Sequence, residues 1–115
     1  MKIYLATPVN GRKEKTLKAK QIAAMQRVEI MAAMCRRWYR DAEFTSAFDY
    51  VEPGVIMPES VIMGHCVKMV IESDMIILDD GWESSQGCTV ERFVAMQYGK
   101  KVKTLNYLKM MDKIG

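Results

Sequence analysis

The sequence predicts an α/β fold in which helices cover both faces of a parallel sheet. Short apolar segments alternate with longer segments in which apolar residues recur every three or four positions. Turn-forming Gly, Pro, Asn and Asp residues separate the two kinds of segment. The resulting order β-α-β-α-β-α-β implies parallel strands joined by right-handed crossovers. Because 115 residues suffice for one hydrophobic core, we expect a single domain over residues 1–115.

The first half of the chain begins with a strand at Lys2–Ala6, which is β-prone and mostly apolar. Pro, Asn and Gly make residues 7–12 a loop. Residues 13–40 predict the longest helix, with one apolar stripe and with most basic residues, Arg27 among them, on an expected solvated face. Aromatic and β-branched residues at 43–51 predict a second strand. The loop after the first strand should lie at the carboxyl edge of the sheet, where ligands bind in open α/β folds.

The second half continues the alternation. Two prolines and a glycine make residues 52–58 a loop, and apolar periodicity over residues 59–73 predicts a second helix. The apolar run Met75–Leu78 predicts a third strand. A helix should follow from about residue 85 to residue 98, with Gly99 at its C-terminal end.

After that helix we expect a fourth strand at residues 101–105 and a short last helix within residues 106–115. Apolar residues in this last segment suggest that it packs on this subunit or on a neighbouring one. The chain also has 11 Met residues, which typically fill gaps in cores and adaptable interfaces. We therefore expect a homo-oligomer.

Several classes of protein are disfavoured by composition. The net charge of +3 gives no reason to expect a nucleic-acid partner. Cys35, Cys66 and Cys88 are an odd number and form no CxxC pair, which argues against a disulfide framework and a structural zinc site. His65 is the only histidine and has no partner at a metal-ligand spacing. We expect neither a metal nor another cofactor.

The sequence also predicts a cytoplasmic protein. It begins directly with strand-like residues, and no signal peptide is recognisable. No run approaches the roughly 18 apolar residues that a membrane span requires, so we expect no membrane partner.

The segment between the third strand and the third helix, residues 79–91, holds the best candidates for chemistry. Ser85 stands where a helix N-cap is expected, and Gly87 allows close approach to the free backbone N–H groups of the first turn. An anion or a polar ligand could bind there. The alternative is that these residues only cap the helix. This is neither a Walker A loop nor a complete dinucleotide fingerprint, because the required Lys and a second loop glycine are missing.

Three carboxylates accompany this segment. Glu91 lies one helical turn beyond Gly87 and on the same face, so it would border a ligand in the loop. The alternative is an exposed glutamate that pairs with Arg92 or with solvent. Asp79 and Asp80 end the third strand at the carboxyl edge, where a substrate hydroxyl or base would be met. Their alternative is turn formation, because Asp-Gly is a common turn pair.

With these residues in place, the chain resembles the nucleoside 2-deoxyribosyltransferase superfamily, which includes small 2′-deoxynucleoside 5′-phosphate N-hydrolases. The resemblance covers nearly the whole chain and is sharpest in the Gly-Trp-Glu-x-Ser-x-Gly-x-x-x-Glu run of residues 81–91. It also includes the first strand, the loop to Gly11 and Arg12, the Ser-Asp pair before the third strand, and Gly99-Lys-Lys-Val. It implies a flavodoxin-like or Rossmann-like three-layer sandwich with a parallel sheet of four to five strands.

The resemblance also implies a reaction and a site. The family's nucleophilic glutamate, which attacks the anomeric carbon of a deoxyribose, falls on Glu91. The family's tyrosine of the first strand falls on Tyr4, and its phosphate-binding loop falls on Ser85 and Gly87. Apart from the resemblance, position at the carboxyl edge adds Gly11 and Asp79 as expected substrate-binding residues and Asp80 as the expected second catalytic group. The implied partner is a small nucleoside or nucleotide.

One position departs from the family pattern. The family carries an aspartate eight positions before the Asp of the Ser-Asp pair, and that position is Cys66 here. Asp79 or Asp80 is the candidate substitute, since glycosyl transfer with retention needs a nucleophile and an acid. Thr89 also replaces a loop glycine. The departure leaves an alternative function, a catalytically inactive nucleotide-binding or sensor module. A third alternative is an interaction protein that uses its Met-rich helices.

Overall fold

The computed structural model describes residues 1–114, and it shows the predicted α/β fold with an all-parallel sheet of four strands. The strands are β1 (Lys2–Ala6), β2 (Glu43–Thr45), β3 (Met75–Leu78) and β4 (Lys101–Thr104), in the spatial order β2-β1-β3-β4. The chain therefore extends the sheet in one direction from β1 to β2 and then in the other direction from β3 to β4. The switch point lies between β1 and β3, and ligands bind beyond the carboxyl ends of such strands.

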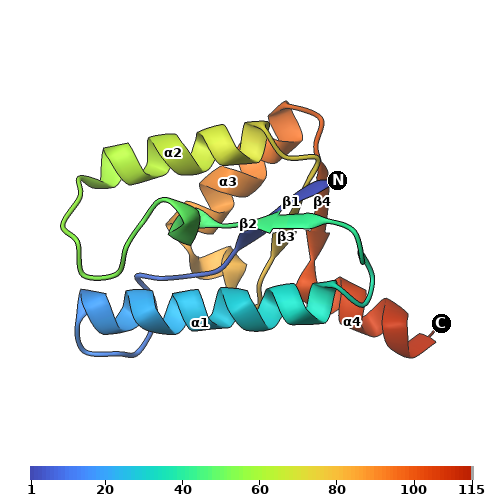
Figure 1. The fold of residues 1–115 in the computed structure, drawn as a ribbon, viewed down its shortest axis with the longest axis horizontal. Coiled ribbons are helices and arrows are strands. Elements are labelled where there is room, and N and C mark those ends of the chain that lie inside the picture. The colour runs from blue at the N-terminus through green and yellow to red at the C-terminus, as the bar shows by residue number, and fades with distance from the viewer. Residues whose placement is uncertain (115) are drawn as a thin grey trace.

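Helices cover both faces of the sheet, which makes three layers (Figure 1). On one face, α1 (Leu17–Cys35) and α4 (Leu105–Ile114) pack against one set of strand residues. On the other face, α2 (Glu59–Ile71) and α3 (Gln86–Gln97) pack against the alternate set. The fold is consistent with a flavodoxin-like sandwich, as the sequence predicted.

The alternation of side chains along β1 decides which residues belong to which core. Ile3 and Leu5 face α1 and α4, whereas Tyr4 and Ala6 face α2 and α3. All four residues of β3 are buried because helices lie on both of its sides. Burying one such Ile or Leu side chain stabilises the fold by about 1.5–3 kcal/mol. Because the side chains of β1 alternate, Tyr4 is a core residue on the same face of the sheet as α3.

The strands β1 and β3 have the predicted bounds, but the first helix and the second strand are shorter than predicted. The helix α1 begins after Thr16, whose Oγ1 accepts a hydrogen bond from the N–H of Ala19 at 3.1 Å. The strand β2 ends at Thr45 rather than at residue 51. A capping box formed by Ser46 and Asp49 starts the 3-10 helix η1 (Ala47–Asp49), and these side-chain hydrogen bonds end the strand.

Local side-chain and backbone geometry also sets the other boundaries. Residues 82–84, expected within a loop, form the 3-10 helix η2 (Trp82–Ser84). Gly99 has a φ of 68°, a left-handed conformation in which glycine ends α3 as predicted. Leu105, predicted in the last strand, is the first residue of α4 and is fully buried. No helix within residues 1–114 combines the length and the apolar character needed to cross a membrane.

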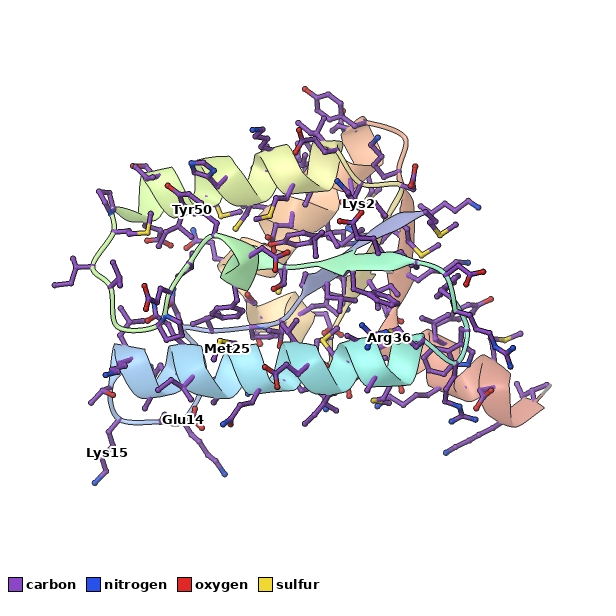
Figure 2. The ribbon with its side chains drawn as sticks, viewed as in Figure 1. Lys2, Glu14, Lys15, Met25, Arg36 and Tyr50 are labelled. Carbon is purple, nitrogen blue, oxygen red and sulfur yellow. The ribbon has the colours of Figure 1, made fainter. Side chains whose placement is uncertain are left out.

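The basic residues around α1 mostly face solvent, as their pattern predicted. Figure 2 shows Lys15 projecting away from the body of the molecule, and Arg36 at the other end of the helix is also exposed. The guanidinium of Arg36 lies 5.4 Å from the centre of the Phe44 ring. Arg27 is different, because its guanidinium reaches the end of β3 and pairs with Asp79. One member of the expected solvated face is therefore part of the sheet edge.

Candidate functional site

A cavity of about 490 Å³ opens at the carboxyl edge of the sheet. The loop after β1 and residues Ser84–Cys88 at the start of α3 form part of its wall. Residues 46–48 after β2 and one side of α2 complete most of the remainder. The loop 52–58, which leads into α2, lies on the same side of the molecule as the start of α1 (Figure 1). This is the place where a doubly wound parallel sheet binds its ligands.

Glu91 is a wall residue of this cavity, and its side chain is almost completely buried. It lies one turn inside α3, whose N-cap is Ser85. The Oγ atom of Ser85 accepts a hydrogen bond from the N–H of Cys88 at 3.2 Å. Glu91 is only 6% exposed, so the alternative of a solvent-exposed glutamate paired with Arg92 does not describe it. Burial of a carboxylate in a cavity wall is costly unless other groups satisfy it.

Tyr4 and Cys66 are the groups that contact Glu91. The hydroxyl of Tyr4 donates a hydrogen bond to Oε2 of Glu91. The thiol of Cys66, on α2, interacts with the same carboxylate. Both Tyr4 and Cys66 are buried and line the cavity. β1 and α2 therefore both reach the Glu91 carboxylate near the start of α3.

The protonation of these groups follows from their burial. Desolvation raises the pKa of Glu91 from its ordinary 4.5 to about 7, although the hydrogen bond from Tyr4 and the contact with Cys66 lower it in part. Desolvation, the charge of Glu91 and their hydrogen bond hold the pKa of Tyr4 well above its usual value. Burial and the neighbouring Glu91 raise the pKa of the Cys66 thiol to about 11. Near pH 7, Glu91 alone of the three changes its charge.

Asp79 lies outside the cavity wall and is held in an ion pair. Its Oδ1 and Oδ2 atoms accept hydrogen bonds from Nη2 and Nε of Arg27 at 2.8 and 2.9 Å, and Thr7 donates to it at 2.7 Å. Burial raises the pKa of Asp79, but the hydrogen bonds from Arg27 and Thr7 and the positive charge of Arg27 lower it below its ordinary value. This carboxylate anchors α1 and the first loop to the end of β3.

Asp80 also lies outside the main cavity. Its side chain is 53% exposed and sits 3.3 Å from Nζ of Lys109 and 3.8 Å from Arg27. It lines a separate depression of about 250 Å³, which it shares with Arg12, Gly81 and the rim residue Gly11. Of the residues predicted for the site, Tyr4, Gly11, Ser85, Gly87 and Glu91 meet at the cavity, whereas Asp79 and Asp80 do not.

Much of the cavity wall comes from residues that the sequence did not single out. One stripe of α2, with spacings of three and four residues, lines the cavity. It consists of Glu59, Ile62, Met63 and Cys66. That spacing was visible in the sequence, but nothing there showed whether the stripe faced the core or a cavity. Gln21 of α1 also lines the cavity, and its Oε1 accepts a hydrogen bond from the N–H of Gly54 at 2.9 Å.

The chemistry of the site centres on one buried carboxylate, Glu91. Within residues 1–114, no group of three or more His, Cys, Asp or Glu side chains is arranged to hold a metal ion. His65 stacks on Tyr50 with ring centres 3.5 Å apart, and it does not line the cavity. What the site presents is a buried carboxylate that gains or loses a proton near neutral pH, at the wall of a partly apolar cavity. Such a group can act as a nucleophile or as a base.

Comparison with known proteins gives one result. No curated protein and no solved structure matches the chain. A family model described as "Domain of unknown function (DUF4406)" matches residues 1–104, which include β1 to β4 and every cavity residue named above. The chain therefore belongs to the DUF4406 family.

Proposed function

We propose that this protein cleaves the N-glycosidic bond of a nucleoside or nucleotide, or transfers its deoxyribosyl group, with Glu91 as the nucleophile. The observation that carries the proposal is the placement of Glu91. Its carboxylate is buried at the wall of a cavity of about 490 Å³, and the Tyr4 hydroxyl orients it. A cavity of this size is within the range that binds small molecules.

The chemistry follows from the carboxylate. In its ionised form Glu91 attacks the anomeric carbon, the bond from this carbon to the base breaks, and the sugar becomes covalently attached to Glu91. The hydrogen bond from Tyr4 holds one carboxylate oxygen and leaves the other to react. Water or a second base then displaces Glu91 from the sugar. The first route is hydrolysis, and the second is deoxyribosyl transfer.

The remaining cavity residues support a ligand of this shape. Phe48, Met57, Ile62 and Met63 give an apolar surface against which a planar base can pack. Ser85 and Gly87 bring the N-terminus of α3 to the same cavity, where N–H groups can hold a sugar hydroxyl or a 5′-phosphate. The base and the sugar would thus lie between α2 and α3.

The direct test is release of free base from a panel of 2′-deoxynucleosides and their 5′-monophosphates, separated by liquid chromatography. We expect the wild-type protein to release base from at least one member, and Glu91→Gln to lose this activity. Glu29→Gln is the matched control, because Glu29 is an exposed glutamate of α1 that does not line the cavity. No base from any member, or full activity in Glu91→Gln, would refute the proposal.

The alternative is a nucleotide-binding or sensor module without turnover. The thiol of Cys66 favours it, because a thiol beside Glu91 does not supply a carboxylic acid to the leaving group. In that case nucleotides should raise the melting temperature without forming product. Stabilisation together with base release would exclude this alternative, and the absence of both would count against each function.

A further inference from the structure

The proposed reaction needs a second proton-transferring group, and the cavity supplies one that the sequence did not single out. Among residues 1–114, the carboxylates that line the cavity are Glu91 and Glu59. Asp79 is committed to Arg27, and Asp80 lies in the separate depression. The carboxylate partner of Glu91 therefore has to come from α2 and not from the end of β3.

Glu59 is well placed on α2 to face the same ligand as Glu91. Glu59, Ile62, Met63 and Cys66 form the stripe of α2 that lines the cavity, and Cys66 contacts Glu91. Glu59 precedes Cys66 by seven residues, which is two helical turns or about 10 Å along the axis. A ligand that occupies the cavity is therefore bordered by both Glu91 and Glu59.

Glu59 can also exchange protons with solvent. It is the first residue of α2 and is exposed at the cavity wall, unlike the buried Glu91. Within residues 1–114 no Lys or Arg side chain forms an ion pair with it. Its carboxylate is therefore open to a ligand and to water, as a group that gives and regains protons must be.

We propose that Glu59 is the general acid and base of the reaction, and that it delivers a proton to a ring nitrogen or carbonyl oxygen of the leaving heterocycle. This inference rests on the proposed function of Glu91. In the first step a Glu91 oxygen bonds to the anomeric carbon, the carbon–nitrogen bond breaks, and its electron pair goes to the base. The proton of the Glu59 carboxyl goes to the base, which leaves neutral.

The second step restores both residues in the hydrolytic route. Water attacks the anomeric carbon, the bond to Glu91 breaks with its electron pair on the Glu91 oxygen, and Glu59 takes the proton that the water loses. An acid that stands away from the anomeric carbon suits an N-glycoside. In O-glycosides the acid must reach the bridging oxygen, which places the carboxyl groups of retaining enzymes about 5 Å apart. A heterocyclic base accepts the proton at an atom of its ring or rim, farther from the anomeric carbon.

The test compares substrates that do and do not need this proton. Three substrates are compared: the 2′-deoxynucleoside of the panel that is cleaved fastest, 2′-deoxyguanosine, and N7-methyl-2′-deoxyguanosine. The methylated base already carries a positive charge, so it leaves as a neutral molecule without taking up a proton. We expect Glu59→Gln to lower kcat/KM for the unmodified nucleosides roughly 100-fold or more. The same variant should leave kcat/KM for the methylated substrate unchanged, and Glu59→Asp should recover part of the lost rate.

Two further variants make the outcome specific. Glu72→Gln is the matched control, because Glu72 is an exposed glutamate at the opposite end of α2 and does not line the cavity. Glu91→Gln should abolish cleavage of every substrate. If Glu91→Gln is inactive while Glu59→Gln retains full rate, or loses rate equally on both kinds of substrate, the role of Glu59 is wrong and the proposed function stands. If Glu91→Gln is fully active, the proposed function itself is wrong.

Discussion

The hydroxyl of Tyr4 donates a hydrogen bond to Oε2 of Glu91, although 87 positions separate the two residues in the chain. β1 brings the donor and α3 brings the acceptor, and both side chains are buried. The contact gives the carboxylate a fixed partner inside a wall that otherwise favours its neutral form. The hydrogen bond therefore influences both the reactivity of Glu91 and the stability of the folded protein.

The first prediction concerns the pH dependence of base release. A nucleophilic Glu91 must be ionised, and burial raises its pKa to about 7. We expect kcat/KM to rise with pH and to reach half of its maximum near pH 7, in steady-state assays from pH 5 to pH 9. A midpoint near 4.5, the ordinary value for glutamate, would show that the reacting carboxylate is not buried in this way.

The second prediction concerns stability. Because the folded pKa of Glu91 lies above its unfolded value, the folded state binds the proton more tightly, and this contribution is complete below pH 4.5. It is lost as pH rises to about 7, with a total of about 3 kcal/mol for a shift of this size. The Glu91→Gln side chain cannot ionise, so the variant lacks this pH-dependent contribution to stability.

Urea unfolding at pH 5.5 and pH 8 should therefore show that the wild-type protein loses stability on going to pH 8 and that Glu91→Gln loses much less. Asp79 does not disturb the comparison, because its lowered pKa keeps it ionised at both pH values. The Glu29→Gln protein provides the control for the loss of one exposed carboxylate. If the wild type and Glu91→Gln lose the same stability between pH 5.5 and pH 8, the raised pKa of Glu91 is contradicted.

The third prediction concerns Tyr4→Phe. The hydrogen bond from Tyr4 lowers the pKa of Glu91, so its loss should move the midpoint of the pH–rate profile to higher pH. A hydrogen bond to a charged group contributes about 1.5–3 kcal/mol, so the variant should also be less stable above that midpoint. Phe keeps the ring in the core, so the stability below pH 5 should change little. A midpoint that moves to lower pH would be inconsistent with the contact.

The fourth prediction separates the two roles considered for Asp79. As the partner of Arg27, Asp79 should matter for stability, and Asp79→Asn should lower the free energy of unfolding by roughly 2–3 kcal/mol. This loss is smaller than for a fully buried pair, because the Arg27 side chain is 28% exposed. Measured well below the melting temperature, KM should stay at its wild-type value. A large rise in KM would instead support the substrate-binding role.

The fold was predicted correctly where local residues alone determine whether a segment forms a strand, a helix or a turn. The apolar runs Lys2–Ala6 and Met75–Leu78 form strands with the predicted bounds, and Gly99 ends its helix as predicted. The strand predicted over residues 43–51 was too long, because the capping box of Ser46 and Asp49 competes with the strand ladder. Such side-chain hydrogen bonds are short-range, yet they depend on backbone angles that the pattern does not reveal.

The candidate site was predicted in part. The spacing between Gly87 and Glu91 correctly placed both on one helix face at the cavity. Asp79 and Asp80 have equally suggestive positions, but their surroundings depend on Arg27, which belongs to a helix more than 50 residues earlier. A basic residue on a predicted solvated face gave no sign that it reaches the end of a strand.

The sequence by itself determined that this chain forms alternating strands and helices, with a capped loop and Glu91 at the carboxyl edge of a parallel sheet. Periodicity and turn residues are local, so they suffice for that much. The tertiary structure decided which carboxylates share the cavity. Glu59 and Glu91 line it, whereas Asp79 is neutralised outside it by Arg27. Ion pairing, desolvation and cavity shape are set by residues distant in sequence, and only the packed fold brings those residues together.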